Sequence, residues 1–183
     1  MRKIIGIIGR ISSGKTHAAN IINMKFGYPI ASFGGYLKFY CESRGLPTDR
    51  KYLQDLGENL IIKNSKQFLD DVIAHFTSDA SPIIVLEGIR HKEILTLIKS
   101  DFKTSILIFI DADQETRYNR YLSRDKDSDI DKTKINFLIR DNHPVEKEIE
   151  SLKEKCDLII DSTDNYEDLL KNFINIKIKP TLN

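Results

Sequence analysis

Acidic residues are missing from the beginning of the chain, where the first carboxylate is Glu42. Residues 1–41 have a net charge of +6, and the remainder, with 22 basic and 27 acidic residues, has a net charge of −5. A segment without carboxylates favours an anionic ligand, because no like charge repels it. The later residues lack the basic excess typical of nucleic-acid-binding proteins, so we expect no nucleic-acid partner.

Cysteines and long apolar runs are also few. The two cysteines, Cys41 and Cys156, indicate a reducing compartment without a disulfide framework, although they leave one bridge possible. The apolar run at 106–110 is far shorter than the roughly 20 residues of a membrane-spanning helix. Arg10 interrupts the apolar run that follows Lys3, and no small-residue cleavage site of a signal peptide follows. We therefore expect a cytoplasmic protein without a membrane segment, whose oligomeric state the residue pattern does not indicate.

The composition that remains is that of one globular domain over residues 1–183, with 40% apolar and 30% charged residues. Short apolar runs alternate with segments of helical character, which predicts an α/β sandwich with a mostly parallel sheet. The expected strands are 4–8, 28–33, 83–86, 106–110 and 158–160, and the expected helices are 15–26, 91–100, 113–124, 134–140, 145–155 and 165–175. The region 34–78 is expected to be polar and helical, with a break at 45–47 and a helix capped by Asp49 after it.

The segment Gly9-Arg10-Ile11-Ser12-Ser13-Gly14-Lys15-Thr16 matches the phosphate-loop pattern G-x-x-x-x-G-K-[ST], between an expected strand and an expected helix. In such a loop the backbone N–H groups converge on phosphate oxygens, and the positive end of the helix adds to their field. Lys15 would bridge the β- and γ-phosphates of ATP, and Thr16 would bind Mg²⁺. The predicted nucleotide-binding residues are Gly9, Ser12, Ser13, Gly14, Lys15 and Thr16.

A phosphate-loop enzyme also needs a carboxylate near the metal, usually where a hydrophobic strand ends. Glu87 and Asp111 both follow an expected strand. Glu87 is the better candidate, because Gly88 and Arg90 come directly after it at the carboxyl end of the strand, where open α/β sheets bind ligands. Arg90 would make a bidentate contact to a phosphate. The alternative is a helix-capping turn with a surface arginine.

Three arginines, Arg117, Arg120 and Arg124, share one face of an expected helix. They indicate either a solvated charged face or an anion site beside a lid, because a charge-dense loop follows them. We expect that lid at about 125–140. The alternating aspartates of this loop also suggest a calcium loop, but Ile130 occupies the position that requires glycine and Asn136 that of the bidentate glutamate. We expect no calcium site there, and no zinc site among the scattered histidines.

Taken in order along the chain, these segments resemble the P-loop nucleoside monophosphate kinase superfamily, which includes adenylate kinase and viral deoxynucleoside monophosphate kinases and is related to dephospho-CoA kinase. The matching segments are GRISSGKT at 9–16, ASFGGYLK at 31–38, YLQDLGENL at 52–60, LEGIR at 86–90, YNRYLSR at 118–124, Arg140-Asp141, and CDLIIDST at 156–163. The LEGIR segment departs from the family's Asp-Gly-x-Arg element, since Glu87 replaces an aspartate and its side chain is one methylene longer.

The resemblance implies a P-loop three-layer sandwich with a five-stranded parallel sheet of order 2-3-1-4-5 and an acceptor-binding helical region at 34–80. It also implies that the loop after the last strand approaches the donor adenine. The residues that it places near the acceptor phosphate are Ser32, Gly34, Lys38, Arg90 and Arg140. It assigns Arg120 and Arg124 to phosphate contacts, Arg124 also to the nucleotide, Thr16 and Glu87 to Mg²⁺, and catalysis to Lys15, Glu87, Arg90, Arg120 and Arg124.

The activity implied is transfer of the γ-phosphoryl group of Mg-ATP to a nucleoside or deoxynucleoside monophosphate. Dephospho-CoA kinase and other small-metabolite kinases are the alternative, but a hydroxyl acceptor benefits from a carboxylate base. No carboxylate lies between the end of the expected second strand and Glu42, although Glu87 could serve as the base. A second alternative is a nucleotide-binding regulatory ATPase, which would need no acceptor.

Replacing Lys15 by Ala tests the phosphate-loop assignment. We expect K15A to abolish phosphoryl transfer, because the lysine neutralises charge on the transferring group. The circular dichroism spectrum and thermal melting should stay close to wild type. Turnover of K15A near the wild-type rate would contradict the assignment.

Overall fold

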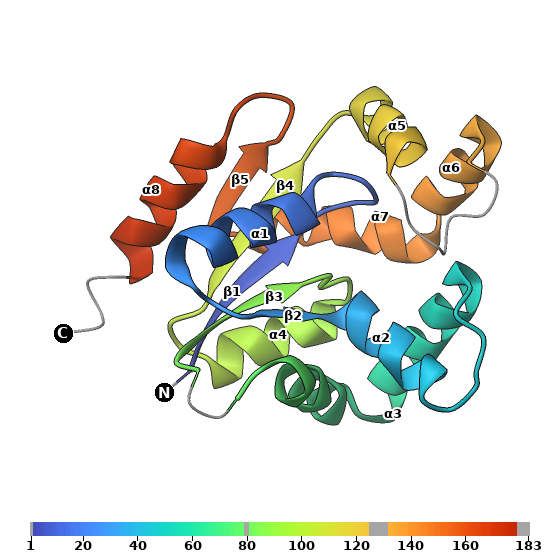
Figure 1. The fold of residues 1–183 in the computed structure, drawn as a ribbon, viewed down its shortest axis with the longest axis horizontal. Coiled ribbons are helices and arrows are strands. Elements are labelled where there is room, and N and C mark those ends of the chain that lie inside the picture. Colours follow the sequence, from blue (N-terminus) through green and yellow to red (C-terminus); the bar gives the residue numbers. More distant parts are fainter. Residues whose placement is uncertain (1, 79–80, 125–131, 179–183) are drawn as a thin grey trace.

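The fold is built on one five-stranded parallel sheet (Figure 1). The computed structural model describes residues 2–78, 81–124 and 132–178. Its strands are β1 (Lys3–Ile8), β2 (Ile30–Ser32), β3 (Ile83–Glu87), β4 (Ile106–Asp111) and β5 (Leu158–Asp161). They pair in the order β2-β3-β1-β4-β5, and each recorded pairing is parallel. The predicted sheet and its order are confirmed.

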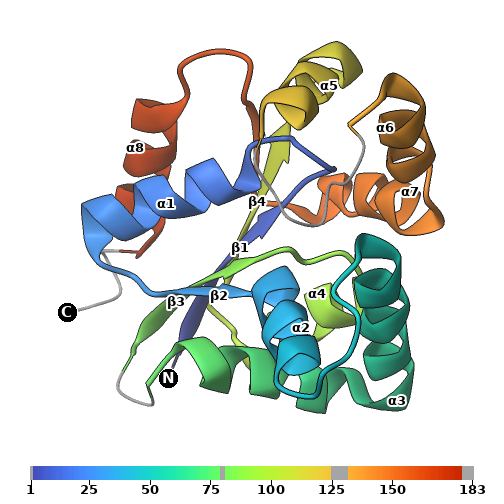
Figure 2. The same ribbon diagram turned by 45° about the vertical axis from the view of Figure 1, so that its right-hand side comes forward.

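Helices cover both faces of the sheet and make the three layers expected (Figures 1 and 2). The helices α1 and α8 lie on one face, and α2, α3, α4 and α7 pack against the other. Their bounds are α1 Lys15–Phe26, α2 Phe33–Glu42, α3 Arg50–Phe76, α4 Lys92–Asp101, α5 Gln114–Ser123, α6 Lys134–Asp141, α7 Pro144–Ser151 and α8 Glu167–Ile178, with a 3₁₀ turn at Lys153–Lys155. The expected helix at 145–155 is thus α7 followed by that turn.

Strand β1 explains why the sheet has two apolar cores. Ile4 and Ile8 pack into one core and Ile5 and Ile7 into the other, because successive side chains of a strand point to opposite faces. All four side chains are fully buried. A strand covered on both faces is therefore a continuous apolar run rather than an alternating one.

The second strand is shorter than expected, because Ser32 begins a helix. Its hydroxyl oxygen accepts a hydrogen bond from the Gly35 N–H at 3.2 Å, which caps α2 and ends β2 before Phe33. Ser32 therefore has a local structural role at the start of the predicted acceptor region.

Helix α3 bends at Asn64, whose backbone is not helical (φ −168°, ψ 89°). The predicted cap is confirmed, since the Asp49 carboxylate accepts from the Tyr52 N–H at 3.1 Å. The Asn64 side chain in turn accepts from the Gln67 N–H at 3.0 Å and begins the second half of the helix. Because of this bend, the two halves of α3 run in different directions (Figure 2).

Both cysteines are free thiols. Cys41 is buried, as expected of a packed hydrophobe, and burial raises the pKa of the partly buried Cys156 to about 12. Among the described residues, no helix is long and apolar enough to cross a membrane. The loop at 125–131, which includes most of the rejected calcium pattern and the first part of the predicted lid, lies outside the described residues.

Gly6 in β1 provides a test of the sheet packing. A Cβ at this position would lie 2.7 Å from Leu107 Cδ2 and 2.8 Å from Ile89 Cδ1. We therefore expect Gly6→Ala to lower the free energy of unfolding by about 1–3 kcal/mol in urea denaturation. Gly34→Ala is the control, because its Cβ would meet nothing within 4 Å and alanine favours helix α2. A G6A protein as stable as wild type would contradict this packing argument.

Candidate active site

The phosphate loop joins β1 to α1 in a conformation that depends on its glycines. Gly9 has φ +152°, and a Cβ there would lie 2.3 Å from the Ile110 carbonyl oxygen of the neighbouring strand. Gly14 has φ +100° and begins α1 without a side-chain cap on the helix. The N–H groups of the first turn therefore point to where a phosphate would bind.

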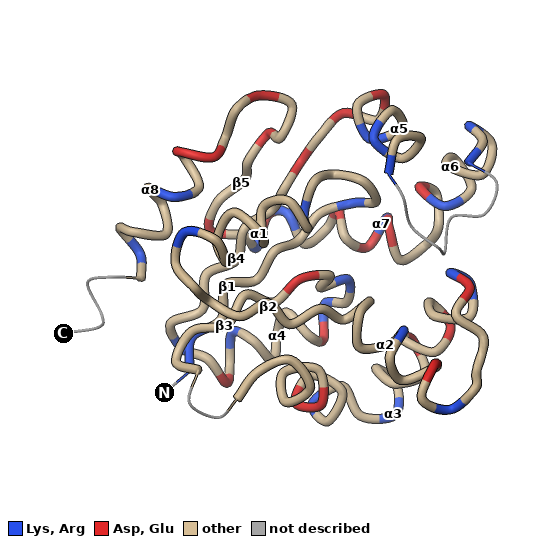
Figure 3. Tube along the Cα trace, in the orientation of Figure 1, with Lys and Arg blue, Asp and Glu red and all other residues tan. Residues whose placement is uncertain are grey.

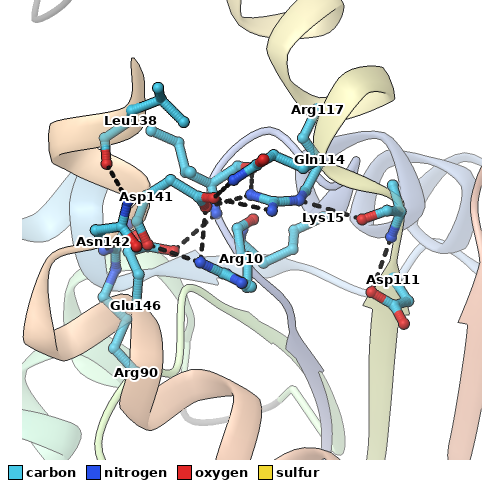
Figure 4. Close-up of polar contacts among 12 residues, drawn as sticks. Arg10, Lys15, Arg90, Asp111, Gln114, Arg117, Leu138, Asp141, Asn142 and Glu146 are labelled. Carbon is cyan, nitrogen blue, oxygen red and sulfur yellow. Dashed lines mark hydrogen bonds and ion pairs between the residues drawn. The ribbon is translucent and has the colours of Figure 1, made fainter. Parts of the chain in front are cut away.

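Lys15 lies over this loop. Its ammonium group donates a hydrogen bond to the Arg10 carbonyl oxygen at 2.6 Å, and Figure 4 shows both residues beside the buried carboxylates described below. The lysine thus lies within the curve of the loop, as expected for a residue that contacts the terminal phosphates of a nucleotide.

The two residues predicted to bind Mg²⁺ are in contact. The Thr16 hydroxyl, in the first turn of α1, donates to Oε1 of Glu87, the last residue of β3, at 2.6 Å. Hydroxyl and carboxylate oxygens suit Mg²⁺, so the pair fits this ion, and the extra methylene of Glu87 does not prevent the contact. The other candidate, Asp111, instead pairs with Lys153 at 2.5 Å. Of the two candidates, Glu87 therefore lies beside Thr16, and its role at a metal stays a prediction.

Arg117 and Arg120 of α5 and Arg124, which follows its last residue, have three different environments. Arg120 lies against the phosphate loop: it donates to the Ser13 carbonyl oxygen at 3.2 Å and to Ser162 Oγ at 2.8 Å. Arg124 lies over the ring of Tyr121, 4.8 Å from its centroid, and Arg140 of α6 lies 5.5 Å from the same centroid. Tyr121 thus brings together one arginine from each side of residues 125–131.

Arg117 does not belong to an anion-binding face. It is 3% exposed and makes a bidentate contact to the carboxylate of Asp141. Neither interpretation of the three-arginine face holds for Arg117, because its side chain is not solvated and its counterion is Asp141 of α6.

Asp141 and Glu146 are the main site feature that the sequence did not predict. Both are buried at 0% exposure beside the phosphate loop. Asp141 also accepts from Gln114 at 3.0 Å and pairs with Arg10 at 3.0 Å (Figure 4). In the sequence, Asp141 belongs to the Arg140-Asp141 pair of the family resemblance, and nothing in that pair indicates that the aspartate is buried. One sequence feature could have indicated that Glu146 is buried: it lies next to Val145 and three residues before Ile149, on the apolar side of α7.

Glu146 contacts the phosphate loop and two arginines. Its Oε2 accepts from the Ile11 N–H at 2.8 Å, and its Oε1 accepts from Arg90 at 2.8 Å and Arg50 at 3.5 Å. Burial by itself raises the pKa of Glu146, but the positive charges of Arg90, Lys15 and Arg50 and the Ile11 N–H outweigh it and hold the pKa below its ordinary value. Glu146 is therefore ionised at neutral pH.

A cavity of about 440 Å³ opens between α2, α3, α4 and α7. The predicted acceptor residues Gly34, Lys38 and Arg90 line it, whereas Ser32 and Arg140 do not. Its other lining residues are Phe33, Gly35, Leu37, Thr48, Arg50, Leu53, Gln54, Gly57, Ile61, Phe68, Gly88, His91, Ile94 and Val145. Three cations therefore reach a largely apolar cavity, and no Asp or Glu belongs to its described lining.

A second cavity, of about 490 Å³, lies beside the other end of the phosphate loop. It is lined by Gly14, His17, Arg120 and residues 162–167, which follow β5. The loop after β5 thus shares a cavity with Gly14, and its approach to the donor adenine, which the resemblance implies, stays a prediction. Figure 3 shows that basic and acidic residues of α5, α6 and α7 lie near the phosphate loop between β1 and α1.

Comparison with known proteins identifies the family. Residues 8–138 match the family model described as an AAA domain. The chain belongs to this AAA domain family. Among curated relatives of this AAA domain protein, a UPF0200 protein of Pyrobaculum aerophilum is 27% identical over 172 residues, 92% of this chain and 93% of the relative. A UPF0200 protein of Thermoplasma volcanium is 25% identical over 167 residues, 90% of each chain.

Solved structures show the fold of this AAA domain protein. Shikimate kinase from Aquifex aeolicus has a TM-score of 0.58 at 18% identity, with 97% of this chain and 96% of that chain covered. TT1252 from Thermus thermophilus has a TM-score of 0.61 at 19% identity, with 100% and 99% covered. The AAA domain protein thus has the P-loop kinase fold, which confirms the predicted fold class.

Asp141 should make stability depend on acid. Burial raises its pKa, but hydrogen bonds from Arg117 and Gln114 and the charges of Arg117 and Arg10 outweigh burial, so its pKa lies below the ordinary 3.8. A lowered folded-state pKa stabilises the fold above the unfolded value, and this contribution is lost as pH falls from about 3.8 through the folded pKa.

We therefore expect Asp141→Asn to cost about 3–5 kcal/mol of unfolding free energy at pH 7. The acid-induced loss of stability below pH 4 should also be shallower than in wild type, as measured by urea denaturation at a series of pH values. Asp168→Asn, at a 90% exposed side chain, is the control and should keep the wild-type pH profile. A D141N profile parallel to wild type would show that Asp141 is not the acid-sensitive group.

Proposed function

We propose that this protein transfers the γ-phosphoryl group of Mg-ATP to a nucleoside or deoxynucleoside monophosphate. The observation that carries the proposal is the 440 Å³ cavity, because Lys38, Arg50 and Arg90 line it and no carboxylate does among the described lining residues. Lys38 pairs with Glu42, and Arg50 and Arg90 pair with Glu146, but neither carboxylate lines the cavity. The wall itself is therefore positive and suits an acceptor that is a dianion.

The donor half of the reaction would use the phosphate loop. Its backbone and Lys15 would hold the phosphates of ATP, and the cavity beside Gly14 and residues 162–167 would take the nucleoside. Mg²⁺, which Thr16 and Glu87 fit, would neutralise charge on the phosphate oxygens when bound. Arg120, held by Ser13 and Ser162 next to the loop, would add positive charge near the transferring group.

The apolar part of the acceptor cavity suits a nucleobase and sugar. Phe33, Leu37, Leu53 and Phe68 contribute to its walls, and its volume is in the usual range of small-molecule sites. Gln54 lines the same cavity, and its buried amide nitrogen has no hydrogen-bond partner among the described residues. A base carbonyl or ring nitrogen would supply the missing acceptor.

The chemistry of the acceptor separates this proposal from the hydroxyl kinases, which include dephospho-CoA kinase. A phosphate acceptor is already ionised, whereas a hydroxyl benefits from a base that removes its proton. Glu87 accepts the Thr16 hydroxyl, and His91 in the cavity wall has its Nδ1 3.9 Å from Glu148 on α7. Neither arrangement supplies a carboxylate to the acceptor cavity, so a monophosphate acceptor is favoured.

A substrate screen tests the proposal. Wild-type protein with Mg-ATP should release ADP at least about tenfold faster with one or more ribo- or deoxynucleoside monophosphates than without acceptor, since positioning of both substrates supplies much of the rate. Dephospho-CoA and shikimate are tested in parallel as substrates with a hydroxyl acceptor, and the K15A protein is the negative control. ADP release with a hydroxyl acceptor alone would contradict the proposed acceptor class. Acceptor-independent ADP release alone would favour the regulatory ATPase.

A further inference from the structure

Glu146 is, like Asp141, an ionised residue that is completely buried beside the phosphate loop. Its side chain is 0% exposed, in the first turn of α7 between the phosphate loop and the acceptor cavity. A helix N-terminus favours a negative charge, which offsets part of the cost of burying this carboxylate. The remaining cost is offset only while its positive and N–H partners stay in place.

The two oxygens of this carboxylate bind different halves of the site. Oε2 accepts from the Ile11 N–H of the phosphate loop, and Oε1 accepts from Arg90 and Arg50, which line the acceptor cavity. Arg50 begins α3, Arg90 follows β3 and Ile11 follows β1, so one carboxylate joins three parts of the chain.

A guanidinium group has several donors in one plane, so a bond to Glu146 leaves other N–H groups of the same arginine for a phosphate. The Arg90 and Arg50 side chains are 29% and 16% exposed, although their shared partner is fully buried. The carboxylate therefore lies behind the two arginines and restricts their orientation from the protein side, while each arginine retains an exposed part.

We propose that Glu146 is a positioning residue that orients Arg90 and Arg50 for the acceptor's phosphate and holds the Ile11 N–H of the phosphate loop. It touches neither substrate and acts through these groups. The acceptor half of this assignment rests on the proposed function, whereas the phosphate-loop half does not. A purely structural ion pair would change the amount of folded protein, but it would not change acceptor affinity selectively.

The first measurement is steady-state kinetics of Glu146→Gln with the monophosphate that the substrate screen identifies. We expect the acceptor KM to rise about tenfold or more, because two charge-assisted contacts lose their orientation, and kcat to fall less than the KM rises. Glu150→Gln, the same change at a 47% exposed side chain of the same helix, should leave both constants unchanged. A fall in kcat at wild-type acceptor KM would overturn the acceptor half of the proposal.

A double-mutant cycle with Arg50→Gln tests whether Glu146 acts through the arginines. R50Q should raise the acceptor KM about tenfold in the wild-type background but only about twofold in the E146Q background, because Arg50 is no longer oriented there. Equal effects in the two backgrounds would show that Glu146 and Arg50 act independently and would overturn the positioning role.

ATP binding without acceptor separates this inference from the proposed function. By calorimetry, E146Q should bind ATP about fivefold more weakly, because the Ile11 N–H loses a charged acceptor, and E150Q should bind it normally. If no monophosphate supports turnover, the proposed function fails, and the ATP measurement alone decides the phosphate-loop half of the role. Unchanged ATP affinity overturns that half.

The charge-preserving variant Glu146→Asp covers the case in which E146Q does not fold. An aspartate is one methylene shorter and cannot keep its contacts to Ile11 and to both arginines at the present distances. We expect E146D to raise either the acceptor KM or the ATP dissociation constant about threefold. Wild-type values of both constants would overturn the inference even without data on E146Q.

Discussion

Charged contacts in the interior hold the phosphate loop in place. Asp141 and Glu146 are both fully buried, and together they bind the Arg10 side chain and the Ile11 N–H of the loop. A buried carboxylate is tolerated only when positive groups and N–H donors surround it, and here those groups are also the parts of the candidate site. The arrangement of the arginines and the shape of the loop therefore depend on each other, and a change in one partner leaves the other with an unpaired charge in the interior.

This dependence relates the two cavities. The donor side is formed by the start of α1, Arg120 and the residues after β5, and the acceptor side by α2, the first half of α3 and the turn after β3. Both sides meet at the carboxyl ends of parallel strands, where the field of the helix N-terminus and the lysine of the phosphate loop favour anions. The absence of acidic residues before Glu42 does not keep carboxylates away from the loop, because the fold brings Glu87, Asp141 and Glu146 to it from later in the chain.

Much of the fold could be predicted because its signals are local. The strands β1, β3 and β4 are largely continuous apolar runs, and the cap Asp49 lies three residues before the Tyr52 N–H that it accepts from. The contact of Thr16 with Glu87 was also predictable, because the phosphate loop and the acid after a neighbouring strand both lie at the carboxyl edge of the sheet. Prediction was less accurate where a side chain replaces a backbone hydrogen-bond partner. Ser32 caps α2 in this way and shortens β2, and Asn64 does so at the bend of α3.

The sequence by itself determined the phosphate loop, the parallel sheet and the resemblance to P-loop kinases, since each depends on residue spacing within a short segment. Only the tertiary structure decided which arginines face the cavities and which are held inside. Arg117, three residues before Arg120 on the same helix, is buried against Asp141, and Glu146 accepts from an N–H group 135 residues earlier in the chain. Such pairings depend on which elements pack together, because a buried charge is stable only beside the partners that the complete fold brings to it.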